Sequence, residues 1–245
     1  MSPIVNPSVH ARRIAKAVPL LALLTALCAG CNERSQQTEG TASPAPAHEH
    51  SSGAERGLPG VESYAHRLDD PARDEWQKPD DVIGLLDCQP GMTVADLGAG
   101  TGYFIGPLSN AVGPEGRVIA LDISPSTVDW LNDRIEREDL RNVEPLVVRP
   151  DDPGLERRAM DRVLIVNTWH HVEDRFEYAK KLLASLRRRG MVLIVDFTLD
   201  SPHGPPAKHR LTNDTVVEEL EAAGFEAETL AESLPYQYAI AGRAR

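Results

Sequence analysis

Three glycines at alternate positions follow a short apolar run near the middle of the chain. The stretch VADLGAGTG, residues 94–102, places Gly98, Gly100 and Gly102 directly after a segment that predicts a strand. Glycine allows positive φ and close approach of the backbone to a ligand, and such a turn points the amino end of the next helix at that ligand. The stretch therefore predicts a nucleotide-binding turn between a strand and a helix.

The glycine spacing and two nearby acids indicate which nucleotide the turn holds. The dinucleotide fingerprint is G-x-G-x-x-G, whereas this turn is G-x-G-x-G and is preceded by Asp96. A carboxylate this close suits a zwitterionic amino-acid group beside a sulfonium cation better than it suits a pyrophosphate. Asp122 lies 20 residues after Gly102, at the end of the next predicted strand, where a carboxylate can accept hydrogen bonds from ribose hydroxyls. These acids favour a methyl donor, with NAD as the alternative.

A second group of residues that could do chemistry follows the fourth predicted strand. Asn167, His170 and His171 belong to the segment NTWHHVED, residues 167–174. This segment lies at the carboxyl end of its strand, where open α/β sheets bind ligands. An imidazole can take up a proton near neutral pH, so His170 or His171 could deprotonate a methyl acceptor. The alternative is a structural role, or a place at the edge of the cofactor.

Two further stretches could lie near a substrate. Trp76 belongs to residues 61–81, which precede the first predicted strand and form either a lid over the cofactor or a surface helix. His209 and Arg210 follow the fifth predicted strand, where an imidazole and a guanidinium could hold an anionic acceptor. The alternative for this second stretch is a proline-stiffened loop with solvated charges.

The elements that must position these residues alternate along the chain. After residue 61, short apolar runs alternate with longer amphipathic segments, which is typical of βαβ units and a parallel sheet. Strands are predicted at residues 93–97, 117–122, 143–148, 162–167, 191–197, 227–230 and 236–241. Helices are predicted at residues 126–137, 176–186 and 212–223. The last of these has a Thr212 cap and closes at Gly224.

These landmarks resemble the class I S-adenosylmethionine-dependent methyltransferases over about residues 82–241, and in overall pattern their ubiquinone and menaquinone branch. Residues 94–102 look like the first motif of that family, and residues 188–191 are similar to its turn before the fifth strand. The resemblance implies a Rossmann-like α/β fold. Its sheet is seven-stranded and mostly parallel, the last strand is antiparallel, and helices cover both faces.

The resemblance also implies roles for particular residues. Asp122 corresponds to the ribose-binding acid and Ile123 to its adenine-packing neighbour, while Asp151 and Asp152 lie where the family contacts the adenine amino group. Asn167 is expected on the cofactor side of the site. The activity implied is transfer of a methyl group from S-adenosylmethionine to a small-molecule acceptor, and no metal is expected.

The first 30 residues have the parts of an export signal. Arg12, Arg13 and Lys16 precede a mostly apolar run at residues 17–29, which is shorter than the ~20 residues of a membrane-spanning helix. LCAGC, residues 27–31, resembles the bacterial lipobox, although Cys28 stands where that motif usually has leucine. We therefore expect lipidation of Cys31 and a place in the cell envelope, facing the periplasm or exterior. A start assigned too far upstream, in a cytoplasmic protein, is the alternative.

Composition separates the region after this signal into two parts. Residues 31–60 hold almost no large apolar side chain and predict a disordered tether, followed by the methyltransferase domain at residues 61–245. The net charge is −11, and it becomes −14 without the three basic residues of the signal. This balance argues against nucleic acid as a partner and against adhesion to anionic lipid, so we expect membrane contact only through a lipid anchor. Because S-adenosylmethionine is made in the cytosol, a tethered binding protein without turnover is a further alternative.

Overall fold

The structure, a computed structural model, describes residues 61–245. The fold below is that of these residues, called the described unit. The predicted signal peptide, the predicted tether and Cys31 lie outside the described residues.

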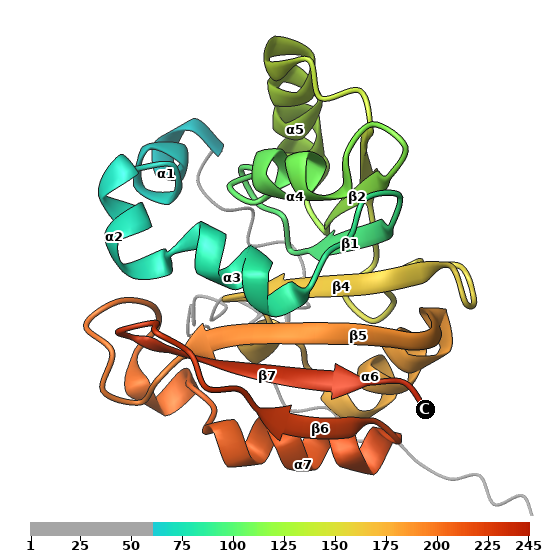
Figure 1. The fold of residues 1–245 in the computed structure, drawn as a ribbon. Helices are drawn as coiled ribbons and strands as arrows, with labels where there is room; N and C mark the ends of the chain where they lie inside the picture. Colours follow the sequence, from blue (N-terminus) through green and yellow to red (C-terminus); the bar gives the residue numbers. More distant parts are fainter. Residues whose placement is uncertain (1–60) are drawn as a thin grey trace, which may run out of the picture. The chain divides into compact units, whose positions relative to one another are not determined.

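The described unit is built on one sheet of seven strands, in the order β3-β2-β1-β4-β5-β7-β6 (Figure 1). The strands are β1 (Thr93–Leu97), β2 (Arg117–Asp122), β3 (Val143–Val147), β4 (Met160–Val166), β5 (Leu186–Phe197), β6 (Glu226–Thr229) and β7 (Gln237–Arg243). Neighbouring strands from β3 to β5 are parallel, whereas β7 runs antiparallel to both β5 and β6. The predicted fold class is therefore confirmed, including the antiparallel last strand.

Helices cover both faces of the sheet. Those described are α1 (Val61–Leu68), α2 (Asp74–Gln77), α3 (Pro79–Leu86), α4 (Ile105–Val112), α5 (Pro125–Glu138), α6 (Arg175–Ser185) and α7 (Asn213–Ala223). The predicted cap of α7 is present, because Thr212 Oγ1 accepts a hydrogen bond from the Thr215 N–H and Gly224 closes the helix at φ 103°. None of the helices in residues 61–245 is both long and apolar enough to cross a bilayer.

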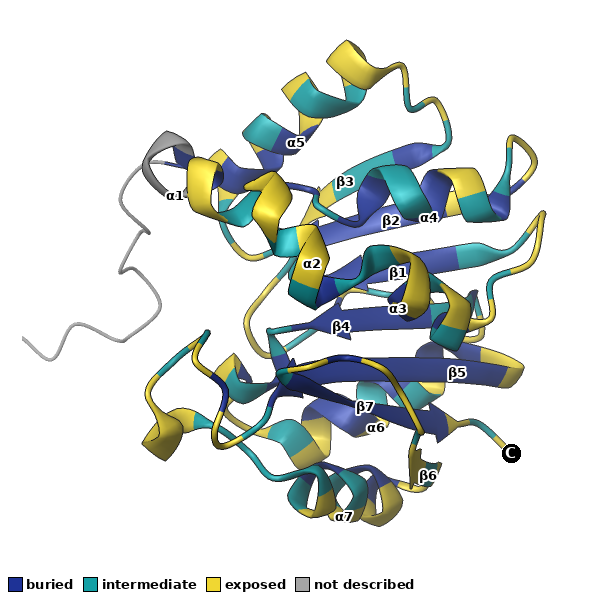
Figure 2. Ribbon diagram, turned by 60° about the vertical axis from the view of Figure 1, so that its left-hand side comes forward, coloured by how far each residue is buried: buried dark blue, intermediate teal, exposed yellow. Residues whose placement is uncertain are grey.

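Alternate residues of the central strands supply two separate cores. On one face Ala95 and Ile165 pack with side chains of α6 and α7, and on the other Val94 and Leu164 pack with α3, α4 and α5. Figure 2 shows the central strands buried along most of their length, with exposed residues on the outer surfaces of the helices. Burial on both faces explains why these strands are nearly continuous apolar runs, and it makes the sheet a rigid support for the loops at its edges.

The fifth strand differs from its prediction. It begins at Leu186 rather than at residue 191, so the predicted turn at 188–191 lies within the strand. Arg189 adopts φ 66°, and the pairing of β4 with β5 shifts register between Met160 and Arg162. Between these paired positions, one residue of β4 lies opposite residues 187–190 of β5, so the region of the predicted turn is an irregularity that interrupts the pairing.

Candidate active site

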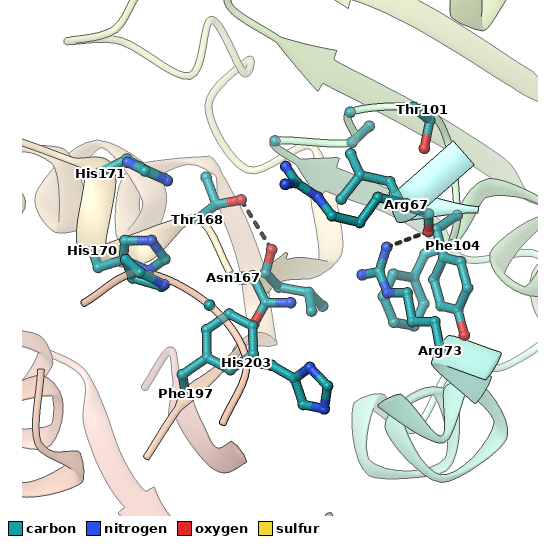
Figure 3. A pocket seen from close by; sticks show the side chains of 18 of the residues that line it. Arg67, Arg73, Thr101, Phe104, Asn167, Thr168, His170, His171, Phe197 and His203 are labelled. Atoms are coloured by element: carbon teal, nitrogen blue, oxygen red, sulfur yellow. Dashed lines mark hydrogen bonds between the residues drawn. The ribbon is translucent and has the colours of Figure 1, made fainter. Parts of the chain in front are cut away.

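A cavity of about 530 Å³ lies at the carboxyl ends of β1, β4 and β5. The strand order reverses between β1 and β4, and open α/β sheets bind ligands at such a point. Four parts of the chain form the walls: the segment from α1 to α2, the glycine turn, the residues after β4, and the end of β5 with its following loop. In Figure 3, Arg67 and Arg73 of the first segment lie across from His170 and His171, with Asn167 and Thr168 between them.

The three glycines of the turn are required for different reasons. All have positive φ, at 74° for Gly98, 55° for Gly100 and 88° for Gly102. A Cβ on Gly98 would lie 2.4 Å from Thr168 Oγ1, and one on Gly102 would lie 2.8 Å from Ile105 and Leu131. A Cβ on Gly100 would meet nothing closer than 3.9 Å. Gly98 and Gly102 therefore allow the turn to pack closely, while Gly100 leaves open space on the cavity wall.

Asp96 presents a buried carboxylate to this cavity. Its side chain is 3 % exposed, and Oδ2 has no hydrogen-bond partner among the described residues. Burial is the main cause that raises the pKa of Asp96 to about 7; the positive charge of Arg73 opposes this increase, and the negative charge of Asp122 adds to it. A buried, unpaired oxygen acceptor of this kind can receive a cationic ammonium or sulfonium group.

Asp122 holds the glycine turn in place. Its carboxylate accepts hydrogen bonds from the Gly100 N–H at 3.1 Å and from the Ser124 N–H at 2.9 Å, and burial raises its pKa. Ile123, next to it, is 55 % exposed, and Val147, which pairs with Asp122 across the strands, is 50 % exposed. Asp122 and Ile123 do not line the cavity themselves, but Asp122 is hydrogen-bonded to Gly100, which does. The exposed side chains of Ile123 and Val147 could pack against the flat base of a nucleotide.

Asp151 and Asp152 lie away from the cavity wall. Asp151 pairs with Arg149 at 2.9 Å, and Asp152 accepts a hydrogen bond from the Gly154 N–H and lies 3.9 Å from Lys181. Both carboxylates are therefore engaged within their own loop or with α6. Their contact with an adenine amino group stays a prediction.

The two histidines predicted after β4 both line the cavity, and a carboxylate holds one of them. His170 Nδ1 lies 2.9 Å from each oxygen of Asp196, at the end of β5, and both side chains are 4 % exposed. The carboxylate favours a proton on Nδ1, which leaves Nε2 able to accept one. The ring centroid of His171 lies 4.1 Å from that of His170, and burial first, then His170, lowers its pKa.

The segment before β1 closes one side of the cavity. Trp76 stacks on His203 with ring centroids 4.7 Å apart and planes 11° apart, and it also contacts Phe197. Trp76 and His203 both line the cavity. Residues 61–81, called the lid segment below, thus contribute to the cavity wall, and their role as a lid over the cofactor stays a prediction.

His209 and Arg210 differ from their expectation, since neither lines the cavity. Arg210 donates hydrogen bonds to the carbonyl oxygens of residues 198, 199, 201, 203 and 205, while His209 is exposed. The guanidinium therefore orders the loop after β5 rather than offering free donors to an anion. The residues of this loop that line the cavity are His203, Gly204 and Pro205.

Asn167 lines the cavity, but its amide is part of a closed ring of three amides. Asn167 Nδ2 donates to Gln77 Oε1 at 3.2 Å, Gln77 Nε2 donates to Gln237 Oε1 at 2.8 Å, and Gln237 Nε2 donates to Asn167 Oδ1 at 2.7 Å. Both glutamines are almost fully buried. The ring joins the lid helix α2 to the end of β4 and to the start of β7.

Sequence comparisons match part of the chain to methyltransferases. The family model described as a methyltransferase domain matches residues 94–190. The chain is 37 % identical over 78 residues to a protein-L-isoaspartate O-methyltransferase of Aeropyrum pernix, covering 32 % of this chain and 30 % of that protein. It is 26 % identical over 121 residues to a demethylmenaquinone methyltransferase of Bacillus cereus, covering 49 % and 50 %. The chain thus spans at most half the length of these curated relatives.

Solved structures lead to the same class. A SAM-dependent methyltransferase from Aquifex aeolicus superposes with a TM-score of 0.71 at 26 % identity, covering 75 % of this chain and 98 % of that one. Together these findings support a class I S-adenosylmethionine-dependent methyltransferase domain, and S-adenosylmethionine is the cofactor they indicate. The residues present fit it, because the open wall at Gly100 adjoins the unpaired Asp96 oxygen and the Asp122 carboxylate. These findings favour S-adenosylmethionine over NAD, the alternative cofactor considered from the sequence.

Proposed function

We propose that this protein transfers the methyl group of S-adenosylmethionine to a small-molecule acceptor bound in the cavity. The observation that carries the proposal is that a single cavity joins the wall formed by Asp96 and Gly100 to the pair His170 and Asp196. Its volume of about 530 Å³ lies within the range of sites for small ligands. The relatives named above act on different acceptors, so they support the reaction class rather than one acceptor.

The residues of the cavity have different roles in such a reaction. Bound S-adenosylmethionine supplies an electrophilic methyl group on a sulfonium. Asp96 accepts a cationic group on one side, and His170 Nε2 takes the proton of an acceptor hydroxyl or acidic carbon on the other. Asp196 then stabilises the imidazolium that forms, as a carboxylate does when it holds the second nitrogen of a histidine base. The stack of Trp76 on His203 keeps water from this side of the cavity.

Transfer of a labelled methyl group tests this proposal. The protein is incubated with S-adenosylmethionine carrying a labelled methyl and with the low-molecular-mass fraction of a bacterial extract. We expect the label in a small molecule, and less of it with the Asp96→Asn variant. S-adenosylhomocysteine binding without any transfer would favour the alternative, a nucleoside-binding protein that has lost turnover.

We also propose that the chain is exported and lipidated at Cys31, on the strength of the basic, apolar and small-residue parts of residues 1–31. Mass spectrometry of the mature protein from bacterial membranes tests this proposal. A lipid-modified Cys31 at the amino terminus is expected, and a Cys31→Ser chain is expected to keep its first 30 residues. An unprocessed wild-type chain in the cytosol would favour the alternative of a start assigned too far upstream.

A further inference from the structure

A second hollow, of about 580 Å³, lies at the opposite edge of the sheet from the active-site cavity. Arg157 and Arg158 precede β4, and Arg187 and Arg188 begin β5, so these four residues gather at the amino ends of two neighbouring parallel strands. The end of α6, the residues after α7 and those after β7 complete the walls. The sheet therefore separates this hollow from the methyl-donor site.

The lining of this hollow carries positive charge in a chain whose net charge is −11. Lys180 and Arg245 join the four arginines, and none of the lining residues is acidic. Lys180, Arg187 and Arg245 each have a carboxylate partner, in Glu177, Asp161 and Glu226.

Three of the arginines have unused donors. The side chains of Arg157, Arg158 and Arg188 are exposed, and none has a hydrogen-bond or ion-pair partner among residues 61–245. The backbone at Arg158 is fixed, because the N–H groups of Arg158 and Ala159 donate to the carbonyl oxygens of Ala184 and Ser185 at the end of α6. A guanidinium group whose donors are unused can bind a phosphate through two of them at once.

The floor of the hollow is apolar. Leu183 and Leu186 line it together with Ala223 and Ala244, and Leu186 is almost fully buried. A ligand that fits this hollow therefore carries a phosphate for the arginines with unused donors and an apolar portion for the apolar floor.

We propose that this basic hollow binds a phosphate-bearing anionic amphiphile, and that the head group of an anionic phospholipid is its source. This inference modifies the expectation from net charge, since three cations without a carboxylate partner remain at this edge of a chain whose net charge is negative. A free phosphate compound offers the same chemistry, and the test separates the two sources.

Binding by charge variants of the full chain tests the proposal. Arg157→Gln/Arg188→Gln removes two unpaired cations from the hollow and leaves Arg158, which has φ 55°, in place. Arg137→Gln/Arg141→Gln makes the same change in charge on exposed residues of the α5 region. Because all four side chains are exposed, both variants are expected to fold like the wild type. The basic residues of the amino terminus are the same in all three proteins, so they do not contribute to any difference.

Two probes distinguish the sources of phosphate. Vesicles of phosphatidylglycerol in phosphatidylcholine report lipid binding by co-sedimentation, with pure phosphatidylcholine as the neutral control, and inorganic pyrophosphate is titrated by calorimetry. At low ionic strength we expect the hollow variant to bind the anionic vesicles about tenfold more weakly, and the control variant to bind like the wild type. Loss of pyrophosphate binding alone would support the phosphate site and assign it to a free compound. Equal losses in both variants, or no binding of either probe, would overturn the proposal.

Discussion

At the scale of single residues, the buried carboxylate of Asp96, which could bind a cationic group, also lowers the stability of the fold when it is ionised. Burial raises its pKa to about 7 from 3.8, so the folded chain keeps a proton that the unfolded chain has already released. The free energy of unfolding therefore falls as the pH rises from about 4 to about 7, and the whole decrease is present above that range. We expect Asp96→Asn to raise the midpoint of thermal unfolding at pH 8 and to change it little at pH 4. An equal change at both values in calorimetric scans would contradict the assignment.

The pair of His170 and Asp196 makes a separate prediction about rate. Loss of a general base typically lowers a rate by about 10²- to 10⁴-fold, so we expect His170→Ala to reduce kcat by about that factor. Asp196→Asn should also reduce kcat, because it no longer stabilises the imidazolium, while affinity for S-adenosylhomocysteine stays within about twofold. His171→Ala is the neighbouring control. Methyl transfer by His170→Ala at the wild-type rate would exclude this residue as the base.

The sequence predicts some of these residues and not others. The glycines, Asp96 and His170 are predicted because each lies in a short motif at the end of a strand or directly after it. Asp196 was not singled out, although an acid that ends the buried run VLIVD is a detectable signal. Its partnership with His170 depends on the pairing of β4 with β5, and the placement of His203 depends on five hydrogen bonds from Arg210. Neither can be deduced from local spacing.

At the scale of elements, the ring of three amides fixes the lid. Replacing Gln77 by Ala removes two of the three hydrogen bonds of this ring and leaves the buried amides of Asn167 and Gln237 incompletely paired. Leaving buried polar groups unpaired costs about 1 to 3 kcal/mol each, so we expect the free energy of unfolding to fall by about that amount. Hydrogen exchange should become faster in residues 71–86. Gln89→Ala, which changes an exposed amide bonded to Asp87, should have little effect on either measurement.

Equal hydrogen exchange in residues 71–86 of Gln77→Ala and the wild type would show that the ring does not hold the lid. Loss of stability in Gln77→Ala with unchanged exchange there would mean that the ring supports only the ends of β4 and β7.

The predicted bounds of strands and helices match the structure within two residues, except at the start of β5. The predicted bounds of β1 and β2 match the structure, because both are buried on two faces and read as continuous apolar runs. The start of β5 was missed because Arg187, Arg188 and Arg189 are exposed and polar, although they still continue the strand. Periodicity reports burial, so it cannot detect a strand segment that extends into solvent.

At the scale of the whole described unit, the sheet separates two kinds of chemistry. The methyl-donor cavity lies at the carboxyl ends of the parallel strands, and the basic hollow lies at the amino ends. The first location could be predicted from the sequence, since the glycine turn and both acids end strands. The second could not, because its cations come from separate segments that only the fold brings together.

The central claim is that the glycine turn binds S-adenosylmethionine, and calorimetric titration with S-adenosylhomocysteine tests it most directly. We predict micromolar binding by the wild type, none with NAD, and affinity about tenfold to a hundredfold lower in Asp122→Ala, because a charged acceptor is worth about 1.5 to 3 kcal/mol. The exposed Asp133→Ala variant, with the same change in charge, should bind like the wild type. Failure of the wild type to bind S-adenosylhomocysteine, or equal affinity in Asp122→Ala, would contradict the account.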